Sequence, residues 1–434
     1  MNQKKVDIIT LGCSKNLVDS ERLIGMFAKK GIKVRHDPAP ELKPAPVVVI
    51  NTCGFIGDAK EESVNTILQY VQAKQQGQVN HLFVMGCLSQ RYAKELPDEI
   101  PEVDGWYGKF DWPAIADRLS ADSVPDIAAA ERVITTPAHH AYIKIAEGCD
   151  RFCAFCAIPL ITGRYTSRTI DDILSEVRSL VAVGVKEFNV IAQDLSSYGL
   201  DLYGRMALPE LIDRMADIEG VEWIRLHYAY PARFPIEIAD IMARRPNVCK
   251  YLDIALQHIS DPVLKSMRRH IDAAGTRALL AELRRRVPGI HIRTTLMVGF
   301  PGEGEAEFRE LLDFVREQRF ERMGAFAYCE EDDTYAAKHL DDSVPEDVKQ
   351  QRLEQLMALQ EQISLELQEE KIGLTVRVVI DREEDEYYVG RTQWDSPEVD
   401  PEVLVRKTKK LCEGNFYDVT VLEALPFELI AEPV

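Results

Sequence analysis

Three cysteines stand within eight residues of this chain, and they limit what it can fold into more than any other feature does. Cys149, Cys153 and Cys156 follow the spacing C-x-x-x-C-x-x-C. Three thiolates on one tight loop can ligate three irons of a cubane cluster and leave the fourth iron open. An open iron can chelate the amino and carboxylate groups of S-adenosylmethionine, whereas a ferredoxin-like carrier needs a fourth thiolate. The alternatives are three core cysteines that coincide by chance, or a zinc site, which usually takes four ligands as two separated pairs.

Three further cysteines are far apart in the sequence but occupy equivalent positions. Cys13, Cys53 and Cys87 each come just after an apolar segment that predicts a parallel strand. Ligands of open α/β sheets bind at the carboxyl ends of the strands. Each cysteine also adjoins a glycine, which lets the backbone approach a bulky cofactor. Either these cysteines converge on a second three-thiolate cluster, or they are ordinary buried cysteines; their spacing leaves both possibilities open.

The first 120 residues alternate short apolar segments with amphipathic ones. The expected strands are residues 6–10, 47–50 and 81–85, and the expected helices are residues 20–30 and 58–75. This alternation is typical of βαβ units and predicts an α/β domain with a parallel sheet. Residues 120–140, which contain Pro125 and Pro137, are expected to form a linker or crossover.

A second alternating series occupies the centre of the chain. Its expected strands are residues 141–146, 187–192, 223–227, 251–255, 291–298 and 322–328. Six βα units predict an open, partial (βα)6 barrel rather than a complete barrel of eight. Thr169 and Asp172 form a capping-box pattern at the start of one helix, and Gly184 ends it. A long amphipathic helix over residues 345–371 is expected to bridge two domains.

After Gly373 the pattern changes to short strands separated by turn residues. The expected strands are residues 375–380, 387–390, 404–405 and 417–422. They predict a small antiparallel β-barrel. The chain is therefore expected to be α/β overall, with domains at residues 1–120, 135–371 and 372–434.

Composition restricts the compartment and the partners. The chain has 434 residues and a net charge of −19, which disfavours wrapping of a nucleic acid and fits a basic protein partner. It has no apolar run of about eighteen residues, so no membrane span is expected. Its first residues lack the apolar segment of a signal peptide. A reducing, cytoplasmic location is expected, where clustered cysteines bind metal more often than they form disulfides. The isolated Cys249, Cys329 and Cys412 are expected to be structural or incidental.

The motifs around the cysteines resemble those of the radical S-adenosylmethionine (SAM) methylthiotransferases over nearly the whole chain. These motifs are Leu11–Glu21, Asn51–Ile56, Met85–Leu88 and the three-cysteine loop with Pro159 and Gly163 after it. The resemblance implies two 4Fe-4S clusters, one on Cys149, Cys153 and Cys156 and an auxiliary one on Cys13, Cys53 and Cys87. It also implies SAM as cofactor, a radical SAM domain in the centre, a TRAM domain at residues 372–434, and a reducing electron donor as partner.

Within this family the chain looks most like the enzymes that methylthiolate the β-carbon of an aspartate in small-subunit ribosomal protein twelve. The motifs that carry this likeness are Ser14–Val18, Tyr228–Pro231, Leu256–Ser260, Arg293–Thr295 and Val298–Glu303. Residues 372–434 hold seven Lys and Arg against fourteen Asp and Glu, a balance of −7. An acidic domain fits a basic ribosomal protein better than it fits tRNA, so no direct tRNA binding is expected. The alternatives are a tRNA (adenosine) methylthiotransferase and, from another class, a non-catalytic iron–sulfur sensor or scaffold.

The candidate contacts to SAM lie in the cysteine loop or follow the barrel strands. They are Phe155, Gln193, Asp194, Gln257, Arg293 and Phe300. The alternatives are a solvated loop for Asp194, a structural salt bridge for Arg293 and a core position for Phe300. His227 and His258 are expected to be packed, hydrogen-bonded histidines rather than catalytic bases. The chain departs from the family pattern at Thr162, Leu195, Ala255 and Asp333, none of which is a candidate cluster ligand.

Overall fold

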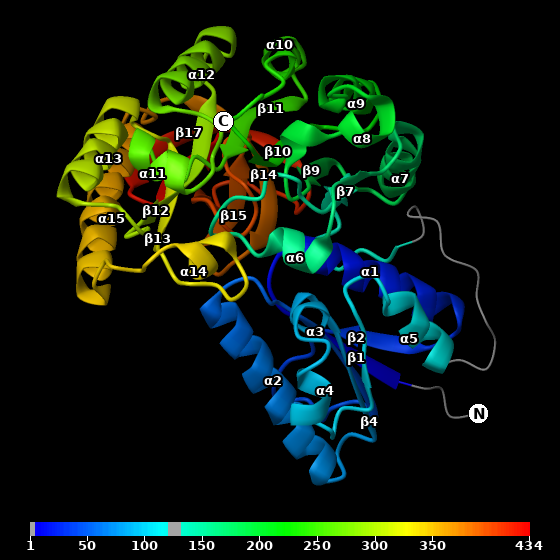
Figure 1. Cartoon of the computed structure of the whole chain (residues 1–434). Coiled ribbons are helices and arrows are strands. Elements are labelled where there is room, and N and C mark those ends of the chain that lie inside the picture. The colour runs from blue at the N-terminus through cyan, green and yellow to red at the C-terminus, as the bar shows by residue number, and fades with distance from the viewer. Residues whose placement is uncertain (1–4, 120–131) are drawn as a thin grey trace. The chain divides into compact units, whose positions relative to one another are not determined.

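The computed structural model describes residues 5–119 and 132–434 (Figure 1). These residues form two compact units. The first comprises Met1–Thr136, Tyr142–Asp150 and Cys156–Leu180, and the second comprises Pro137–Ala141, Arg151–Phe155 and Val181–Val434. Residues 120–131, which make up much of the expected linker, lie outside the described residues. The division of the chain into domains at residues 1–120, 135–371 and 372–434 stays a prediction.

The first unit contains a five-stranded parallel sheet with the order β2-β1-β3-β4-β5. Its strands are β1 (Lys5–Thr10), β2 (Lys33–His36), β3 (Val47–Thr52), β4 (His81–Gly86) and β5 (Gly105–Trp106). The three central strands are those expected from the sequence. The edge strands β2 and β5 were not expected, because they are only four and two residues long and are only partly buried.

Helices cover both faces of this sheet (Figure 1). They are α1 (Ser14–Lys29), α2 (Gly57–Gln75), α3 (Cys87–Arg91), α4 (Leu96–Glu99) and α5 (Trp112–Leu119). Apolar side chains of α1 and α5 pack on one face, and those of α2, α3 and α4 pack on the other. Helix α1 begins six residues earlier than expected. Its first turns bury polar side chains such as Asn16 and Asp19, so they lack the apolar periodicity by which a helix is predicted.

A short hairpin and a short helix complete the described part of the first unit. Strand β7 (Ala146–Glu147) pairs with β8 (Thr166–Ser167), and α6 (Ile158–Thr162) lies between them in the chain. Helix α7 (Ile170–Ala182) follows, and the hydroxyl of Thr169 accepts the backbone N–H of Asp172 at 3.2 Å. The expected cap of α7 is therefore present.

A six-stranded sheet has the order β6-β9-β10-β11-β12-β13, which follows the chain, and all of its strands except the end of β6 belong to the second unit. Its strands are β6 (His140–Lys144), β9 (Glu187–Ile191), β10 (Trp223–Ala229), β11 (Val248–Ile254), β12 (His291–Val298) and β13 (Arg322–Ala327). Neighbouring strands from β9 to β13 pair in parallel. Sequential parallel strands without a closing pair form the open, partial barrel that the sequence predicts.

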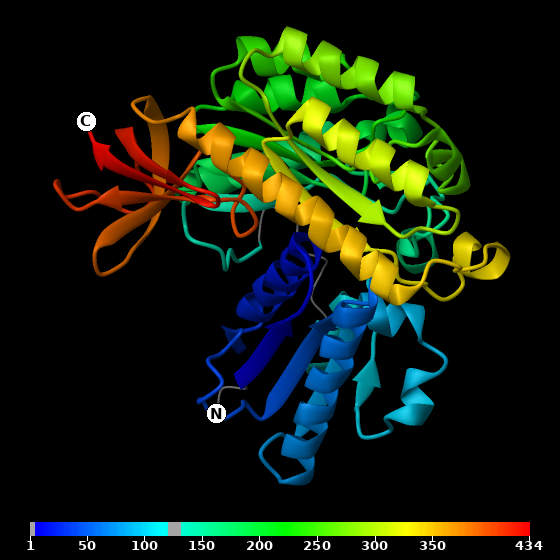
Figure 2. The same cartoon turned by 90° about the vertical axis from the view of Figure 1, so that its left-hand side faces the viewer.

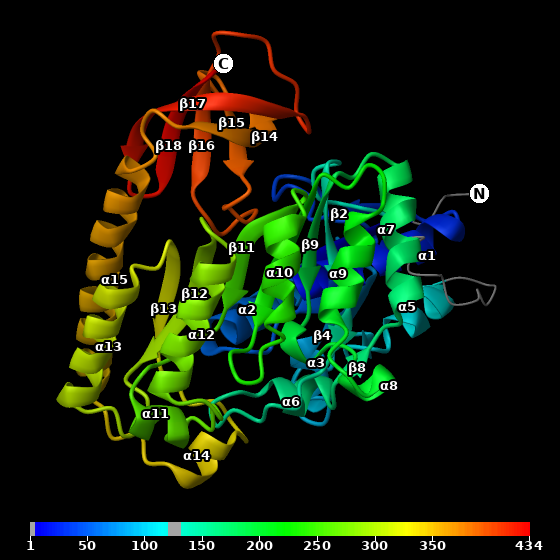
Figure 3. The same ribbon diagram turned by 90° about the horizontal axis from the view of Figure 1, so that it is seen from above.

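Helices between the strands cover the outer face of this sheet (Figure 3). The main ones are α9 (Leu208–Ala216), α10 (Glu237–Arg244), α12 (Ala273–Arg286) and α13 (Glu305–Gln318). Shorter pieces lie at the ends of strands, namely the 3-10 helix η2 (Leu195–Ser197), α8 (Leu200–Tyr203), α11 (Asp261–Ser266) and α14 (Tyr335–His339). Among residues 5–119 and 132–434, no helix is both long and apolar enough to cross a membrane.

The last residues form a closed five-stranded barrel with the order β14-β15-β16-β18-β17. Its strands are β14 (Thr375–Glu383), β15 (Tyr387–Thr392), β16 (Glu402–Arg406), β17 (Phe416–Leu425) and β18 (Glu428–Pro433). Four pairings are antiparallel, as expected, but β16 and β18 pair in parallel. Strand β18 was not expected, because it is separated from β17 by only Pro426 and Phe427.

Helix α15 (Glu346–Glu369) joins the six-stranded sheet to the small barrel (Figure 2). It contacts β12, β13 and α13 on the sheet side and β17 on the barrel side. Buried ion pairs connect the two parts directly. Arg391 of the barrel pairs with Glu187 of β9 at 2.8 Å, and Asp395 of the barrel pairs with Arg322 of β13 at 2.5 Å. We call these contacts the sheet–barrel joint, and with α15 they make the second unit one packed body.

Candidate functional site

The strand-end cysteines, Cys13, Cys53 and Cys87, lie at one edge of the first unit's sheet. Cys53 directly follows β3, Cys87 directly follows β4 as the first residue of α3, and Cys13 follows β1 after two residues. The strands β1, β3 and β4 are adjacent and parallel, so their carboxyl ends share this edge. The structure thus brings the three thiols together, and their role as cluster ligands stays a prediction.

Two glycines show how closely the backbone is packed here. At Gly12 φ is +88°, and a Cβ placed there would lie 2.7 Å from Cβ and 2.9 Å from Sγ of Cys53. At Gly86 φ is +104°, and a Cβ would lie 2.5 Å from the carbonyl oxygen of Thr52. Only glycine meets both the left-handed conformation and these approaches without strain. The glycines beside the strand-end cysteines are therefore required by the geometry of the site.

Asn16 ties the three strand ends to one another from the first turn of α1. Its side-chain amide donates to the carbonyl oxygens of Leu11 at 2.9 Å and Thr52 at 3.1 Å. Its Oδ1 lies 3.7 Å from Sγ of Cys87. Because Asn16 is 1% exposed, these hydrogen bonds are sheltered from water and fix the relative positions of the thiols.

The three thiols differ in their electrostatic surroundings. Desolvation opposes the ionisation of Cys13, but the cations of Lys15 and Lys109 and the N–H groups that begin α1 hold its pKa below the ordinary value. Burial raises the pKa of Cys87 to about 12 against the effect of Lys109, and negative charge on Cys13 and Cys53 adds to the increase. Burial likewise raises the pKa of Cys53. Iron binds the thiolate, so Cys53 and Cys87 would lose their protons in exchange for metal.

A buried cluster of four charges lies beside the strand-end cysteines. Lys109 is 2% exposed, and its Nζ lies 3.1 Å from Oδ2 of Asp19 and 3.8 Å from Oε1 of Glu147. Lys144 also pairs with Asp19 and Glu147. Burial opposes the charge on Lys109, yet the two carboxylates and the nearby thiolates hold its pKa well above the ordinary value. A permanent positive charge therefore faces the strand-end cysteines and compensates negative charge there.

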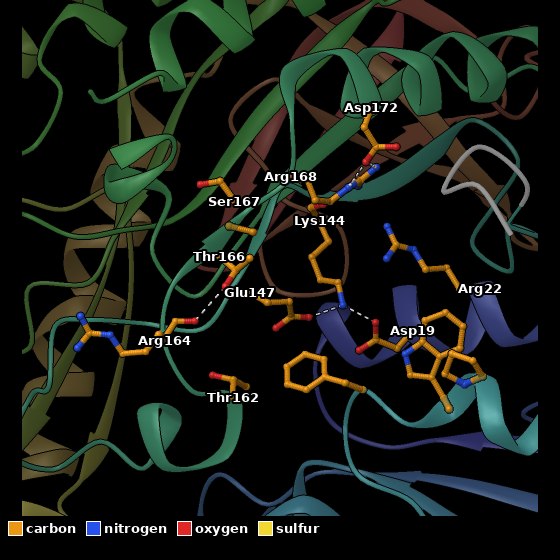
Figure 4. A pocket seen from close by; sticks show the side chains of 14 residues that line it. Asp19, Arg22, Lys144, Glu147, Thr162, Arg164, Thr166, Ser167, Arg168 and Asp172 are labelled. Atoms are coloured by element: carbon orange, nitrogen blue, oxygen red, sulfur yellow. Dashed lines mark hydrogen bonds and ion pairs between the residues drawn. The ribbon is translucent and has the colours of Figure 1, made fainter. Parts of the chain in front are cut away.

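Three of these four charged residues line a pocket of about 810 Å³ in the first unit (Figure 4). They are Asp19, Lys144 and Glu147, and Phe110 and Trp112 are among the other lining residues. Among the described residues that line the pocket there is no cysteine. The pocket is thus adjacent to the charge cluster rather than part of the strand-end site itself.

The cysteine loop, residues 149–156, follows β7. The backbone N–H of Cys149 donates to the carbonyl of Gly163 at 3.3 Å, and that of Ala154 donates to the carbonyl of Met267 at 3.0 Å. Phe152 has a left-handed φ of 51°, an unfavourable conformation for a residue with a side chain. Such strain persists only where surrounding contacts impose it and is common at ligand-binding loops.

Two of the predicted SAM contacts meet beside this loop. The rings of Phe155 and Phe300 lie edge to face, with centroids 6.2 Å apart. Phe300 is fully buried in an apolar cluster that includes Ala154, Met267 and Tyr328. Phe155 is only partly buried, so it presents an aromatic surface at the edge of that cluster. Phe300 therefore occupies a core position, which the sequence left open, and it also lies next to the cysteine loop.

Asp194 and Gln257 also lie at carboxyl ends of barrel strands. Asp194, next to Gln193 after β9, accepts Nε–H of Arg151 at 2.7 Å and the hydroxyl of Ser197 at 2.6 Å, which connects it to the cysteine loop. Gln257 is buried with a φ of 71°, and its Oε1 has no hydrogen-bond partner among residues 5–119 and 132–434. A buried, unsatisfied amide oxygen fits a site where a polar ligand binds.

Arg293 lies elsewhere. Its Nη1 pairs with Oδ1 of Asp400 of the barrel at 2.5 Å, which is the structural salt bridge considered from the sequence. The two histidines are packed and hydrogen-bonded, as expected. Nε2 of His227 lies 3.2 Å from Oδ1 of Asn189, and Nε2 of His258 lies 3.2 Å from Oε2 of Glu303. Both rings are buried and engaged in hydrogen bonds.

Several residues around the thiols were not predicted. Arg269 donates Nη1–H to Sγ of Cys153 at 3.2 Å, and the hydroxyl of Tyr230 lies 3.9 Å from the same sulfur. Asn16 and Tyr230 belong to sequence motifs described above, and those motifs are the signal that could have identified them as site residues. Lys109 and Arg269 reach the thiols only through tertiary contacts, and a single sequence carries no signal for them.

Groups of three cysteines are the donor set that a cubane iron–sulfur cluster with one open iron requires. In the described parts of the chain, no three His, Cys, Asp or Glu side chains lie close enough to ligate a single metal ion. In a cubane cluster each thiolate ligates its own iron, so the sulfur atoms stand farther apart than in a mononuclear site. The chain has two such groups of three cysteines, one at the strand ends and one in the cysteine loop.

Comparison with protein-family models gives three matches along the chain. Residues 5–108 match an uncharacterized protein family, UPF0004, residues 143–315 match the radical SAM superfamily, and residues 372–434 match the TRAM domain. Together these matches cover most of the chain.

Comparison with curated proteins gives relatives that match from end to end. The chain is similar to the ribosomal protein uS12 methylthiotransferase RimO of Parabacteroides distasonis, with 58% identity over 99% of both chains. It is also similar to the RimO proteins of Bacteroides fragilis, with 58% identity, and Porphyromonas gingivalis, with 57%, in each case over 100% of both chains.

Comparison with solved structures shows the same fold. The radical SAM methyltransferase TsrM of Kitasatospora setae aligns with a TM-score of 0.54 at 16% identity, covering 75% of each chain. The cobalamin-dependent SAM radical enzyme OxsB aligns with a TM-score of 0.52 at 12% identity, covering 82% of this chain and 56% of its own.

Proposed function

The chain belongs to the RimO family of radical SAM methylthiotransferases, and on that basis we propose that it attaches a methylthio group to the β-carbon of an aspartate in ribosomal protein uS12. The enzyme class, the radical SAM chemistry, and the use of SAM and two 4Fe-4S clusters follow from family membership. The assignment of ligands and contacts to particular residues is our proposal.

One observation about the chain itself carries the proposal most directly. It holds two separate groups of three cysteines, one at the strand ends of the first unit and one in the cysteine loop. We propose that Cys13, Cys53 and Cys87 ligate the auxiliary cluster and that Cys149, Cys153 and Cys156 ligate the radical SAM cluster. When bound, these clusters and SAM supply the electron, the organic radical and the sulfur of the transferred group.

The residues of this chain would position the cofactor and keep water away. We propose that Phe155 and Phe300 offer an apolar surface to SAM, and that the unsatisfied Oε1 of Gln257 accepts one of its N–H groups. Asp194 and Gln193 would bind polar parts of SAM at the end of β9. Contact between Arg293 and SAM stays a prediction, because Arg293 would have to leave Asp400 to reach the cofactor.

The charge of the TRAM domain supports a basic protein substrate. The balance of −7 over residues 372–434 is unchanged when the buried pair-forming Arg391 and Asp395 are both left out. An acidic surface attracts a basic ribosomal protein and repels the phosphates of tRNA. We therefore propose that the enzyme binds uS12 without direct binding of tRNA, acts in the cytoplasm, and takes electrons from a separate reductant.

Mass spectrometry of uS12 tests the function. Cells that lack the gene are complemented with the wild-type chain, with Cys53→Ala, with Cys153→Ala, or with Cys329→Ala as a matched control at an exposed, isolated cysteine. We expect one methylthio group on an aspartate of uS12 with the wild type and with the control, and none with the other two variants.

Other results would point to other functions. Unmodified uS12 in cells with the wild-type chain would refute the ribosomal assignment, and gene-dependent methylthio-adenosine in tRNA would identify the nucleoside activity instead. Clusters without any SAM cleavage by the purified protein would identify a sensor or scaffold.

A further inference from the structure

A buried arginine contacts one of the proposed cluster ligands. Arg269 is 3% exposed and lies in the segment between α11 and α12. Its Nη1–H donates to Sγ of Cys153 at 3.2 Å, and its Nη2–H donates to the carbonyl oxygen of Ala255. The guanidinium is thus held at both of its Nη atoms, with one N–H aimed at the sulfur.

A stack of three side chains holds this guanidinium in place. The ring of Tyr230 lies between two arginines, with its centroid 4.1 Å from Cζ of Arg269 and 4.2 Å from Cζ of Arg151. The hydroxyl of Tyr230 donates to the backbone carbonyl of Arg269 at 2.6 Å. Arg151 in turn pairs with Asp194 at 2.7 Å. These contacts from Tyr230 and the carbonyl of Ala255 hold the guanidinium of Arg269 against the thiol of Cys153.

We propose that Arg269 is a positioning residue that raises the reduction potential of the cluster held by the cysteine loop. The inference rests on the proposed function, in which Cys153 is a ligand of that cluster. Reduction adds one electron from the external reductant and one negative charge to the cluster, with no bond formed or broken. A buried cation and an N–H···S hydrogen bond both stabilise the more negative state, and hydrogen bonds to cluster sulfurs are a known means of tuning potential.

The neighbouring arginine provides a matched control. Arg268 also carries a guanidinium and lies one residue away, but it stacks over the ring of Tyr335, with Cζ 3.7 Å from the centroid. Replacing Arg268 removes the same charge from the same segment without removing a hydrogen bond to Cys153. The two variants therefore separate the contact from a general change in charge.

The test is an EPR-monitored redox titration of the reconstituted full-length chain. Cys13, Cys53 and Cys87 are replaced by alanine in every sample, so that only the cluster of the cysteine loop contributes to the signal. In this background Arg269→Gln, Arg269→Lys and Arg268→Gln are compared with the unmodified arginines. Iron and sulfide are measured alongside, to show that each sample holds its cluster.

For Arg269→Gln we expect the ratio of reduced to oxidised cluster at a fixed potential to fall about tenfold, equivalent to about 59 mV for one electron. Arg269→Lys keeps the positive charge but loses the planar guanidinium. The potential of its cluster should therefore lie between those of the reference and Arg269→Gln. Arg268→Gln should match the reference. The backbone bond to Tyr230 persists in all variants, which protects the local fold.

Equal potentials for the reference and both Arg269 variants, with full iron content, would overturn the inference and leave the proposed function intact. If Arg269→Gln failed to hold iron, Arg269→Lys alone would decide, since an unshifted potential there together with an unshifted Arg268→Gln would also contradict it. A reference sample without any cluster would instead refute the proposed role of the cysteine loop.

Discussion

At the scale of single residues, the strand-end site depends on side chains that are not ligands themselves. Asn16 satisfies one carbonyl group just after β1 and one at the end of β3, and Gly12 leaves room for the thiol of Cys53. Lys109 places a buried positive charge near the thiols. Three thiolates and a cluster form an anionic group, so this charge reduces the repulsion that assembling the site would otherwise create.

Replacing Asn16 should weaken the auxiliary site. Asn16→Ala leaves the carbonyls of Leu11 and Thr52 without their buried donor, at a cost of about 1–3 kcal/mol of stability. We expect iron and sulfide per chain to fall when they are measured in a Cys149→Ala/Cys153→Ala/Cys156→Ala background, where only the auxiliary site counts. Asn80→Ala is the control, because Asn80 is exposed and precedes β4 at the opposite end of the strand. Equal iron content in Asn16→Ala and Asn80→Ala would contradict the role given to Asn16.

Residues with chemical meaning in a motif were predictable, whereas residues that act through space were not. The spacing of Cys149, Cys153 and Cys156 predicts an iron–sulfur cluster from the sequence alone, and this assignment stays a prediction. The position of Cys53 directly after a strand indicated which sheet edge it would occupy. Arg269 is far from the cysteines in sequence and contacts Cys153 only because the segment after α11 folds back onto the loop. No local pattern records such a contact.

At the scale of elements, the sheet–barrel joint is held by ion pairs that are almost wholly buried. Arg322 and Asp395 pair at 2.5 Å with side chains 4% and 3% exposed. Burial opposes the ionisation of Asp395, but Arg322 and Lys371 outweigh it and lower the pKa of Asp395 to about 2. Buried pairs add little compared with an apolar contact, yet removing one partner is costly because a charge is left alone.

A double-mutant cycle on this pair should show strong coupling. Asp395→Asn leaves the guanidinium of Arg322 buried without its carboxylate and should lower the free energy of unfolding by about 3–5 kcal/mol. Arg322→Met/Asp395→Asn should lose clearly less than the sum of the two single changes, as measured by urea unfolding of the apoprotein. Additive losses would mean that the pair is not coupled in solution.

His140 should make the same joint sensitive to acid. Burial, and then the nearby cation of Arg391, lower the pKa of His140 to about 4 from its ordinary 6.5, against the effect of Glu187 and Asp381. The folded chain therefore keeps the ring neutral, while the unfolded chain protonates it near pH 6.5. The stability present above pH 6.5 is lost as the pH falls toward 4, by about 2 kcal/mol between pH 7.5 and 5.0.

The measurement is the pH dependence of urea unfolding for the wild type and for His140→Asn. The variant can be less stable at every pH, but it should lose about 2 kcal/mol less than the wild type between pH 7.5 and 5.0. Parallel curves for the two proteins would assign the acid sensitivity to groups other than His140.

Most elements could be predicted where the apolar periodicity is regular. Strands β3, β4 and β12 and helices α2 and α15 have nearly the expected bounds. The start of α1 could not be predicted, because the polar side chains that serve the strand-end site interrupt its apolar face. The parallel pairing of β16 with β18 could not be predicted either, since it depends on closure of the barrel rather than on the residues of either strand.

At the scale of the whole molecule, the net charge of −19 favours encounters with basic partners. The end of β14 and the turn before β15 concentrate this charge, with four consecutive acidic residues from Glu383 to Glu386. All four are exposed. Ionic attraction of this kind acts mainly on association and weakens as salt screens it.

Charge reversal on this turn should weaken the use of uS12. Glu384→Lys/Asp385→Lys/Glu386→Lys should raise KM for uS12 several-fold and flatten its increase with NaCl, while kcat changes little. The control reverses Glu305, Asp313 and Glu317 on the exposed side of α13, and it should keep the KM of the wild type. Equal KM values for the two triple variants would show that total charge, rather than the charge of the barrel turn, guides binding.

The sheet–barrel joint also has a consequence for how these enzymes diversify. Glu187 and Arg322 belong to the sheet, while their partners Arg391 and Asp395 belong to the barrel. If the barrel alone is exchanged for that of an enzyme with other residues at positions 391 and 395, these residues no longer match Glu187 and Arg322 of the sheet. Each mismatch would leave a buried charge without its partner. Changes in the barrel are therefore expected to occur together with changes at the paired positions on β9 and β13. A chimera intended to redirect the enzyme to another macromolecule has to transplant those positions together with the barrel.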